Sequence, residues 1–119
     1  MQDTSDTREY YRGQIESESA RIYLATAHAK NVGYLHAKIQ KAQEGKKTLT
    51  IGEIDGVFVL EEYRRKGIGT HLYKLAKEWL KSYEVQRIQL NVASRNSAGL
   101  FFWNSLGFNE LVRRLDTEI

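Results

Sequence analysis

The middle of the chain joins a strand-like run to an amphipathic helix through a short glycine-containing turn. Residues 48–60 are rich in apolar and β-branched side chains and predict a strand. The turn 64–69 follows, and apolar residues then recur at helical spacing, which predicts a helix over residues 69–83. A second strand is predicted after that helix, at residues 87–92. A strand–helix–strand order requires a crossover connection, so the chain is expected to form a mixed sheet with helices packed on it.

The front of the chain predicts one helix and a hairpin. Residues 3–19 are polar and predict a helix, whereas residues 20–29 and 32–39 predict two strands. Lys30-Asn31 predicts the tight turn between these strands, because asparagine tolerates positive φ. Residues 40–47 are charged and contain a glycine, which predicts an exposed loop.

The end of the chain predicts a helix at residues 96–106, closed by Gly107, and a final strand at residues 108–115. The expected order is α, β, β, β, α, β, α, β, an α/β (α+β) fold. We expect one domain over residues 1–119, with an N-terminal helix at about 1–19 and a core at 20–119. A chain of 119 residues has no room for two ordinary domains.

Composition excludes several classes of function. Cysteine is absent, which removes disulfides, thiolate metal ligands and a cysteine nucleophile, and the three histidines lack metal-ligand spacing, so no metal is expected. No apolar run approaches a membrane span, and no leader is visible, so a cytoplasmic location is expected without a membrane partner. A net charge of +3 is too weak a signal for nucleic acid, although it suits an anionic ligand.

The turn Arg64-Arg65-Lys66-Gly67-Ile68-Gly69 predicts a phosphate site. The first N–H groups of a helix have no partner within the helix, and the helix dipole is positive there. Glycines let an anion approach the backbone, so a phosphate or pyrophosphate is the natural ligand. The alternative is an ordinary strand–helix turn with a solvated basic cluster. The spacing matches neither a P-loop nor a dinucleotide-binding fingerprint.

The same turn resembles the signature [Q/R]-x-x-G-x-[G/A] of the GNAT superfamily of N-acetyltransferases. A second resemblance is Asn96 followed by Leu106-Gly107-Phe108, and a third is Val32-Gly33-Tyr34 in the predicted hairpin. The resemblance covers about residue 20 to the end. It implies a mostly antiparallel central sheet flanked by helices, in which the strands before and after the first long helix splay apart.

The resemblance also implies acetyl-coenzyme A as co-substrate. In this family the backbone amides of the turn hold the pyrophosphate, the preceding strand binds the pantetheine through its backbone, and an asparagine and an aromatic residue on the second helix line the coenzyme. The residues at these positions here are Val57, Phe58, Val59, Arg64, Arg65, Lys66, Gly67, Ile68, Gly69, Thr70, Asn96 and Trp103.

Acetyl transfer by direct attack requires a neutral amine, so a base must take a proton from the ammonium form, whose pKa is near 10. Glu53 lies where some family members place a catalytic glutamate and is the first candidate. Asp55 is two residues on and shares a strand face with Glu53 unless a bulge intervenes. A bulge at Gly56 would free an N–H near Val57 or Phe58 for the oxyanion.

Trp103 stands where this family often has the tyrosine that protonates the leaving thiolate. An indole N–H has no useful acidity, so either the thiolate leaves unaided or another tyrosine, Tyr63 or Tyr73, replaces the missing acid. The alternative is that Trp103 is an ordinary core aromatic.

The expected function is acetyl-CoA-dependent N-acetylation of a primary amine on a small molecule or polypeptide. The alternatives are a catalytically weak or inactive coenzyme A-binding module and, further off, a small basic nucleic-acid-binding domain. Family members usually begin with a strand and two helices, for which the roughly 20 residues before the hairpin leave little room. An exposed apolar face would then be covered either by residues 3–19 or by a second subunit in a homodimer.

Overall fold

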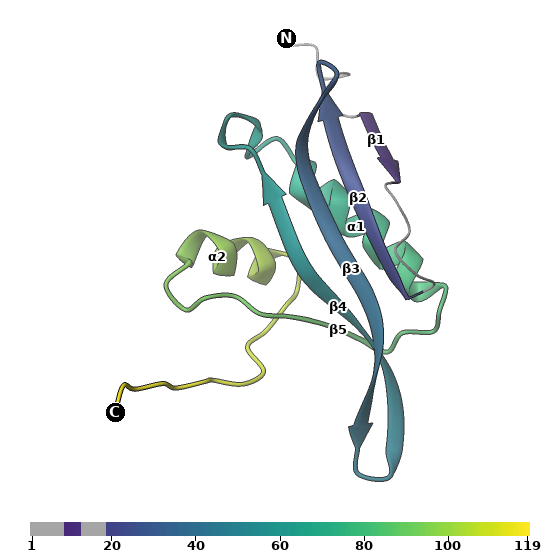
Figure 1. Ribbon diagram of the computed structural model, residues 1–119, viewed down its shortest axis with the longest axis vertical. Coiled ribbons are helices and arrows are strands. Elements are labelled where there is room, and N and C mark those ends of the chain that lie inside the picture. The colour runs from purple at the N-terminus through teal and green to yellow at the C-terminus, as the bar shows by residue number, and fades with distance from the viewer. Residues whose placement is uncertain (1–8, 13–18) are drawn as a thin grey trace.

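The computed structural model describes residues 9–12 and 19–119 of the chain and contains one five-stranded sheet (Figure 1). The strands follow chain order in the sheet, and all neighbours are antiparallel except the fourth and fifth, which are parallel. The predicted mixed, mostly antiparallel fold is therefore confirmed. The elements are β1 (Glu9–Arg12), β2 (Ala20–Ala27), β3 (Lys30–Glu44), β4 (Lys47–Val59), the 3₁₀ helix η2 (Glu61–Tyr63), α1 (Ile68–Lys81), β5 (Arg87–Leu90) and α2 (Ser97–Ser105).

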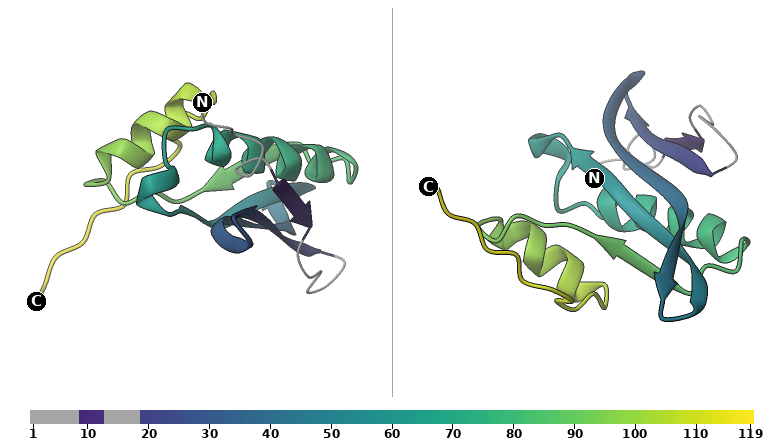
Figure 2. Two further views of the ribbon diagram at one scale, coloured as in Figure 1. Left: turned by 90° about the horizontal axis from the view of Figure 1, so that it is seen from above. Right: turned by 60° about the horizontal axis from the view of Figure 1, so that its bottom comes forward.

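Both α-helices lie on one face of the sheet (Figure 2). The apolar stripe of α1, which includes Leu72, Ala76 and Leu80, packs on inward side chains of β2 and β3 such as Leu35. At Gly52 of β4 an added Cβ would lie 2.8 Å from a methyl carbon of Leu80, so glycine is needed for this close approach. The opposite face, called the outer face below, is covered by neither α1 nor α2.

The predicted helix over residues 3–19 is wrong where the structure describes it. Glu9–Arg12 forms β1 and pairs with β2, from Glu9 opposite Thr26 to Arg12 opposite Tyr23. Two adjacent tyrosines favour an extended chain, and the edge of β2 offers it a hydrogen-bonding partner. Residues 1–8 and 13–18 lie outside the described part of the chain. The first strand is thus present, contrary to the expectation that the front of the chain holds only a helix.

The two hairpin turns also differ from the prediction. His28 and Ala29, with φ of 53° and 65°, make the first turn, and Lys30 and Asn31 already belong to β3. Residues 40–47 are not a loop, because β3 and β4 continue as a ribbon to a turn at Gly45 (Figure 1). Hydrogen bonds between polar side chains of the two strands stabilise this exposed ribbon. In one of them Lys41 Nζ donates to Thr50 Oγ1 at 3.0 Å.

The predictions for the later elements are confirmed except at the end. The predicted helices and the strand between them match α1, β5 and α2 to within a few residues, and Gly107 closes α2 with a φ of 101°. The predicted strand 108–115 is wrong: residues 109–119 are exposed and form no strand. A strand needs a partner along its edge, and this segment leaves the body of the molecule (Figure 1). Among the described residues, no helix is long and apolar enough to cross a membrane.

Candidate functional site

The glycine turn connects the end of β4 to the start of α1 through the short helix η2. Arg65 and Gly67 both have positive φ, 62° and 85°, and Gly67 is the N-cap of α1. The first intrahelical bond runs from the N–H of His71 to the Gly67 carbonyl, 3.0 Å, and no side chain of the described residues caps the helix. The amides before His71 therefore sit at the positive end of α1 without a capping side chain, as an anion site requires.

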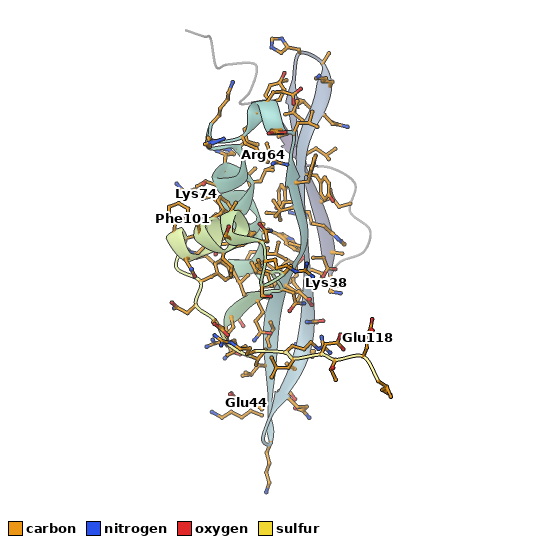
Figure 3. The ribbon with its side chains drawn as sticks, turned by 90° about the vertical axis from the view of Figure 1, so that its left-hand side faces the viewer. Lys38, Glu44, Arg64, Lys74, Phe101 and Glu118 are labelled. Atoms are coloured by element: carbon orange, nitrogen blue, oxygen red, sulfur yellow. The ribbon has the colours of Figure 1, made fainter. Side chains whose placement is uncertain are left out.

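Arg64 contacts β4, although its charge suggested a place in the basic cluster around the phosphate. Its Nε donates to the Val59 carbonyl at 2.7 Å, and its guanidinium lies 5.6 Å from the centre of the Phe58 ring. Figure 3 shows Arg64 at the turn, beside the end of β4. The side chain thus ties the turn to β4, while Arg65 and Lys66 stay exposed beside it.

The strands β4 and β5 separate before β4 ends. Their parallel pairing runs from Ile51 opposite Arg87 to Ile54 opposite Leu90, whereas β4 continues to Val59. On the β5 side, the last five residues of β4 have no strand partner within the described part of the chain. This divergence is the predicted splay, and it leaves the backbone of Val57–Val59 at an open edge next to the glycine turn, where the Val59 carbonyl already accepts from Arg64.

The two candidate acids lie on the outer face. The register with β3 skips Asp55, since Gly56 pairs with His36 and Ile54 pairs with Ala37. The bulge therefore lies at Asp55, one residue before the expected position. Asp55 lies two residues after Glu53 and so stays on the same face of β4, where its carboxylate contacts Lys38, the residue opposite Glu53.

Both acids have partners on β3 that the sequence did not reveal. Gln40 Nε2 donates to Glu53 Oε1 at 2.7 Å, and Lys38 Nζ lies 3.2 Å from Asp55 Oδ2. His36 Nδ1 lies 3.8 Å from the same oxygen of Asp55. The alternation of polar residues along the predicted second strand could have suggested a polar row, but matching it to the acids required the register.

Trp103 is buried among aromatic rings on the helix side. Its ring meets Tyr73, Phe102 and Phe108 edge-to-face, with centroid distances of 5.7, 4.8 and 5.2 Å. Burial raises the pKa of Tyr73, so this phenol stays protonated at neutral pH. Trp103 thus has the surroundings of a core residue, and Tyr73 is the protonated hydroxyl packed against it.

Asn96 caps the second helix. Its side-chain oxygen accepts from the N–H of Gly99 at 2.9 Å. An added Cβ at Gly99 would lie 2.5 Å from the Asn96 side chain, so the two residues depend on each other. The capping bond alone explains an asparagine here.

A family model for the acetyltransferase (GNAT) family matches residues 2–108. The chain belongs to the GNAT acetyltransferase family. A 28% identical relative, an N-alpha-acetyltransferase of Sulfurisphaera tokodaii, aligns with 86% of this chain, which spans 64% of that protein's length. An aminoglycoside N(6')-acetyltransferase type 1 of Acinetobacter genomosp. 13 is 26% identical and aligns over 93% of this chain and 77% of its own length.

Solved structures show the same fold. The tetramutant of the BH1408 protein from Bacillus halodurans superposes with a TM-score of 0.80 at 19% identity, over 87% of this GNAT chain and 69% of its own. The aminoglycoside N-acetyltransferase AAC(6')-Iy in complex with CoA gives a TM-score of 0.77 at 19% identity, over 87% and 78%. At this identity the likeness concerns the fold.

Proposed function

We propose that this chain transfers an acetyl group from acetyl-CoA to a primary amine. The carrying observation is the conjunction of an uncapped helix start at Gly67 with an open strand edge at Val57–Val59. The first offers amides to a pyrophosphate, and the second offers backbone groups to the amide-containing pantetheine. The turn amides of residues 65–70 would hold the pyrophosphate. Arg64 would keep the turn in place through its bond to Val59.

The proposed base is Glu53, with Asp55 as the alternative. Glu53 accepts from a neutral amide, which keeps its carboxylate oriented and leaves Oε2 for a proton or a bridging water. Asp55 is nearer the divergence of β4 and β5, but it must give up its ion pair with Lys38 to accept a proton. The attacking nitrogen forms a bond to the acetyl carbon, the carbon–sulfur bond breaks, and coenzyme A leaves as a thiolate. An N–H near Val57 or Phe58 would stabilise the oxyanion.

The thiolate of coenzyme A can be protonated by a side chain or can leave without a proton. Trp103 occupies the position that the family resemblance gives to the acid, but its indole N–H has no useful acidity. Tyr73 supplies a neutral hydroxyl beside it, and a thiol with a pKa near 8.5 can also leave unprotonated. The rival function, a coenzyme-binding module without turnover, is favoured by the burial of Trp103. Release of free thiol from acetyl-CoA in the presence of an amine separates the two functions. The cytoplasmic location stays a prediction from the sequence.

Gly67→Val should weaken acetyl-CoA binding by about tenfold or more, measured by calorimetry. A Cβ at Gly67 would meet no protein atom within 4 Å, so the side chain would occupy the space proposed for the phosphate. The positive φ of 85° adds backbone strain, for which Gly45→Val is the matched control. Gly45 has a φ of 64° and equally open surroundings, but lies at the tip of the β3–β4 ribbon. Equal affinity in a folded Gly67→Val variant would reject the pyrophosphate assignment.

A homodimer is also part of the proposal. The sequence motivated it by an open sheet edge at the front of the chain, where β1 pairs with β2 instead. The apolar surface that supports it now includes Leu111, Val112 and Leu115, which are 64%, 75% and 86% exposed after α2. Exposed apolar groups of this kind favour association. Light scattering at micromolar concentration should give about twice the monomer mass of 13.8 kDa, and Val112→Asp should weaken association by on the order of tenfold. A strict monomer would reject the homodimer.

A further inference from the structure

The outer face carries an apolar hollow that the proposed chemistry has not used. It has a volume of about 340 Å³ and lies across β2, β3 and β4. This size falls at the lower end of small-molecule sites, roughly 300–1,000 Å³. Tyr34 and Phe58, 42% and 43% exposed, both line it and are register partners in β3 and β4, with ring centroids 6.3 Å apart. Its principal lining residues are Ile22, Leu24, Asn31, Tyr34, Phe58 and Leu60.

The hollow adjoins the proposed site of acetyl transfer. Phe58 belongs to the open edge of β4, and its ring lines the hollow on the face that also carries Asp55 and Glu53. A strand rises about 3.3 Å per residue, so along β4 Phe58 lies roughly 7–10 Å from Asp55, the alternative base, and roughly 16 Å from Glu53. If an acceptor amine is hydrogen-bonded to Asp55 at about 2.8 Å, a large side chain on the carbon that bears the amine would reach the hollow.

The charges at this place favour one kind of acceptor. Among the described residues, none that lines the hollow is charged, and the guanidinium of Arg64 lies over the Phe58 ring at 5.6 Å. A cation at the rim repels a polycationic acceptor such as an aminoglycoside. The apolar lining also offers few hydrogen-bond partners to the hydroxyl groups of an aminoglycoside. Together the carboxylates of Asp55 and Glu53 and the ammonium of Lys38, which pairs with Asp55, carry one net negative formal charge, which complements a single ammonium group. The remainder of a long acceptor could leave over the exposed outer face.

We infer that the hollow binds the first side chain of a polypeptide whose α-amine is acetylated, and that this side chain is apolar. This inference rests on the proposed acetyltransferase function and narrows its acceptor. It makes the outer face a specificity site, since Leu24, Tyr34 and Phe58 would select the side chain and the acids would receive the amine.

The test compares acetyl transfer, followed by thiol release, to short peptides that differ only in their first residue. A peptide beginning with leucine should exceed one beginning with glycine in kcat/KM by at least about tenfold, as expected for added methylenes in an apolar pocket. Leu24→Asp should bring this ratio close to one, without changing the KM for acetyl-CoA. Leu100→Asp is the matched control, because Leu100 is 39% exposed on α2 and should leave the ratio unchanged. If Leu24→Asp does not fold, Tyr34→Ala replaces it, because Tyr34 is half-exposed. Tyr34→Ala should lower the same ratio.

Two results would overturn the inference while leaving the proposed function intact. One is equal kcat/KM for the leucine and glycine peptides. The other is a preference for an aminoglycoside or a lysine side chain over both peptides. If acetyl-CoA binds but no amine in the panel is acetylated, the proposed function fails, and the inference fails with it.

Discussion

Glu53→Gln should lower the rate of acetyl transfer at neutral pH by about 100-fold, with acetyl-CoA affinity almost unchanged. Glutamine keeps the shape of the side chain, and its amide oxygen can still accept from Gln40, whose bond to Glu53 measures 2.7 Å. The variant therefore removes the proton acceptor without removing the contact that orients it. Steady-state thiol release with a saturating amine measures the rate, and calorimetry measures the affinity.

The pH dependence and two further variants make this prediction specific. Raising the pH deprotonates the amine in solution and should partly restore the rate of Glu53→Gln. Glu44→Gln makes the same change at an exposed position where β3 ends and should have no effect. Wild-type activity in Glu53→Gln, together with a large loss in Asp55→Asn, would transfer the role to Asp55.

The sequence predicted the elements whose signals are local. The stripe of α1 and the closure of α2 by Gly107 follow from helical spacing and from one residue with positive φ. The glycine turn was found because its motif, its preceding strand and its following helix agree. The likeness to GNAT enzymes added the divergence of β4 and β5, which no local pattern encodes.

The failures share a dependence on partners distant in sequence. Asn31 was the better turn former by propensity, yet the turn falls at His28 and Ala29, because the pairing of β2 with β3 fixes where the chain reverses. Residues 40–47 looked like a loop because charged side chains serve an exposed two-stranded ribbon equally well. The strand expected after Phe108 has apolar residues and the free side of β5 as an available edge, yet residues 109–119 pair with no strand in the described structure.

The candidate acids illustrate the same limit at the site. Glu53 was identified from the GNAT resemblance and Asp55 from its place two residues on, but Lys38 and Gln40 were not, since one extra residue at the bulge decides which β3 side chain meets which acid. Which charged and polar groups surround a base therefore depends on the register between β3 and β4. A motif gives the residue and leaves its partners undefined.

Trp103→Ala should destabilise the protein by about 3–5 kcal/mol, the range for deleting a buried large aromatic side chain. The ring is 6% exposed and contacts Tyr73, Phe102 and Phe108, so its removal opens a cavity between α2 and α1. Urea unfolding followed by circular dichroism measures the free energy of unfolding. Phe101→Ala is the matched control on the same helix: Phe101 is 78% exposed, and its loss should cost within about 0.5 kcal/mol.

Trp103→Tyr then separates the core role from a role in turnover. Tyrosine keeps a ring for Tyr73 and Phe108 to pack on and adds a hydroxyl where the GNAT likeness places a proton donor. A folded Trp103→Tyr protein should keep its turnover or increase it, because the position would regain a general acid. Severely reduced turnover with normal coenzyme affinity would instead mean that the indole itself takes part in the reaction.

For the stability prediction, equal free energies of unfolding in Trp103→Ala and Phe101→Ala would show that the aromatic cluster does not hold α2 in place.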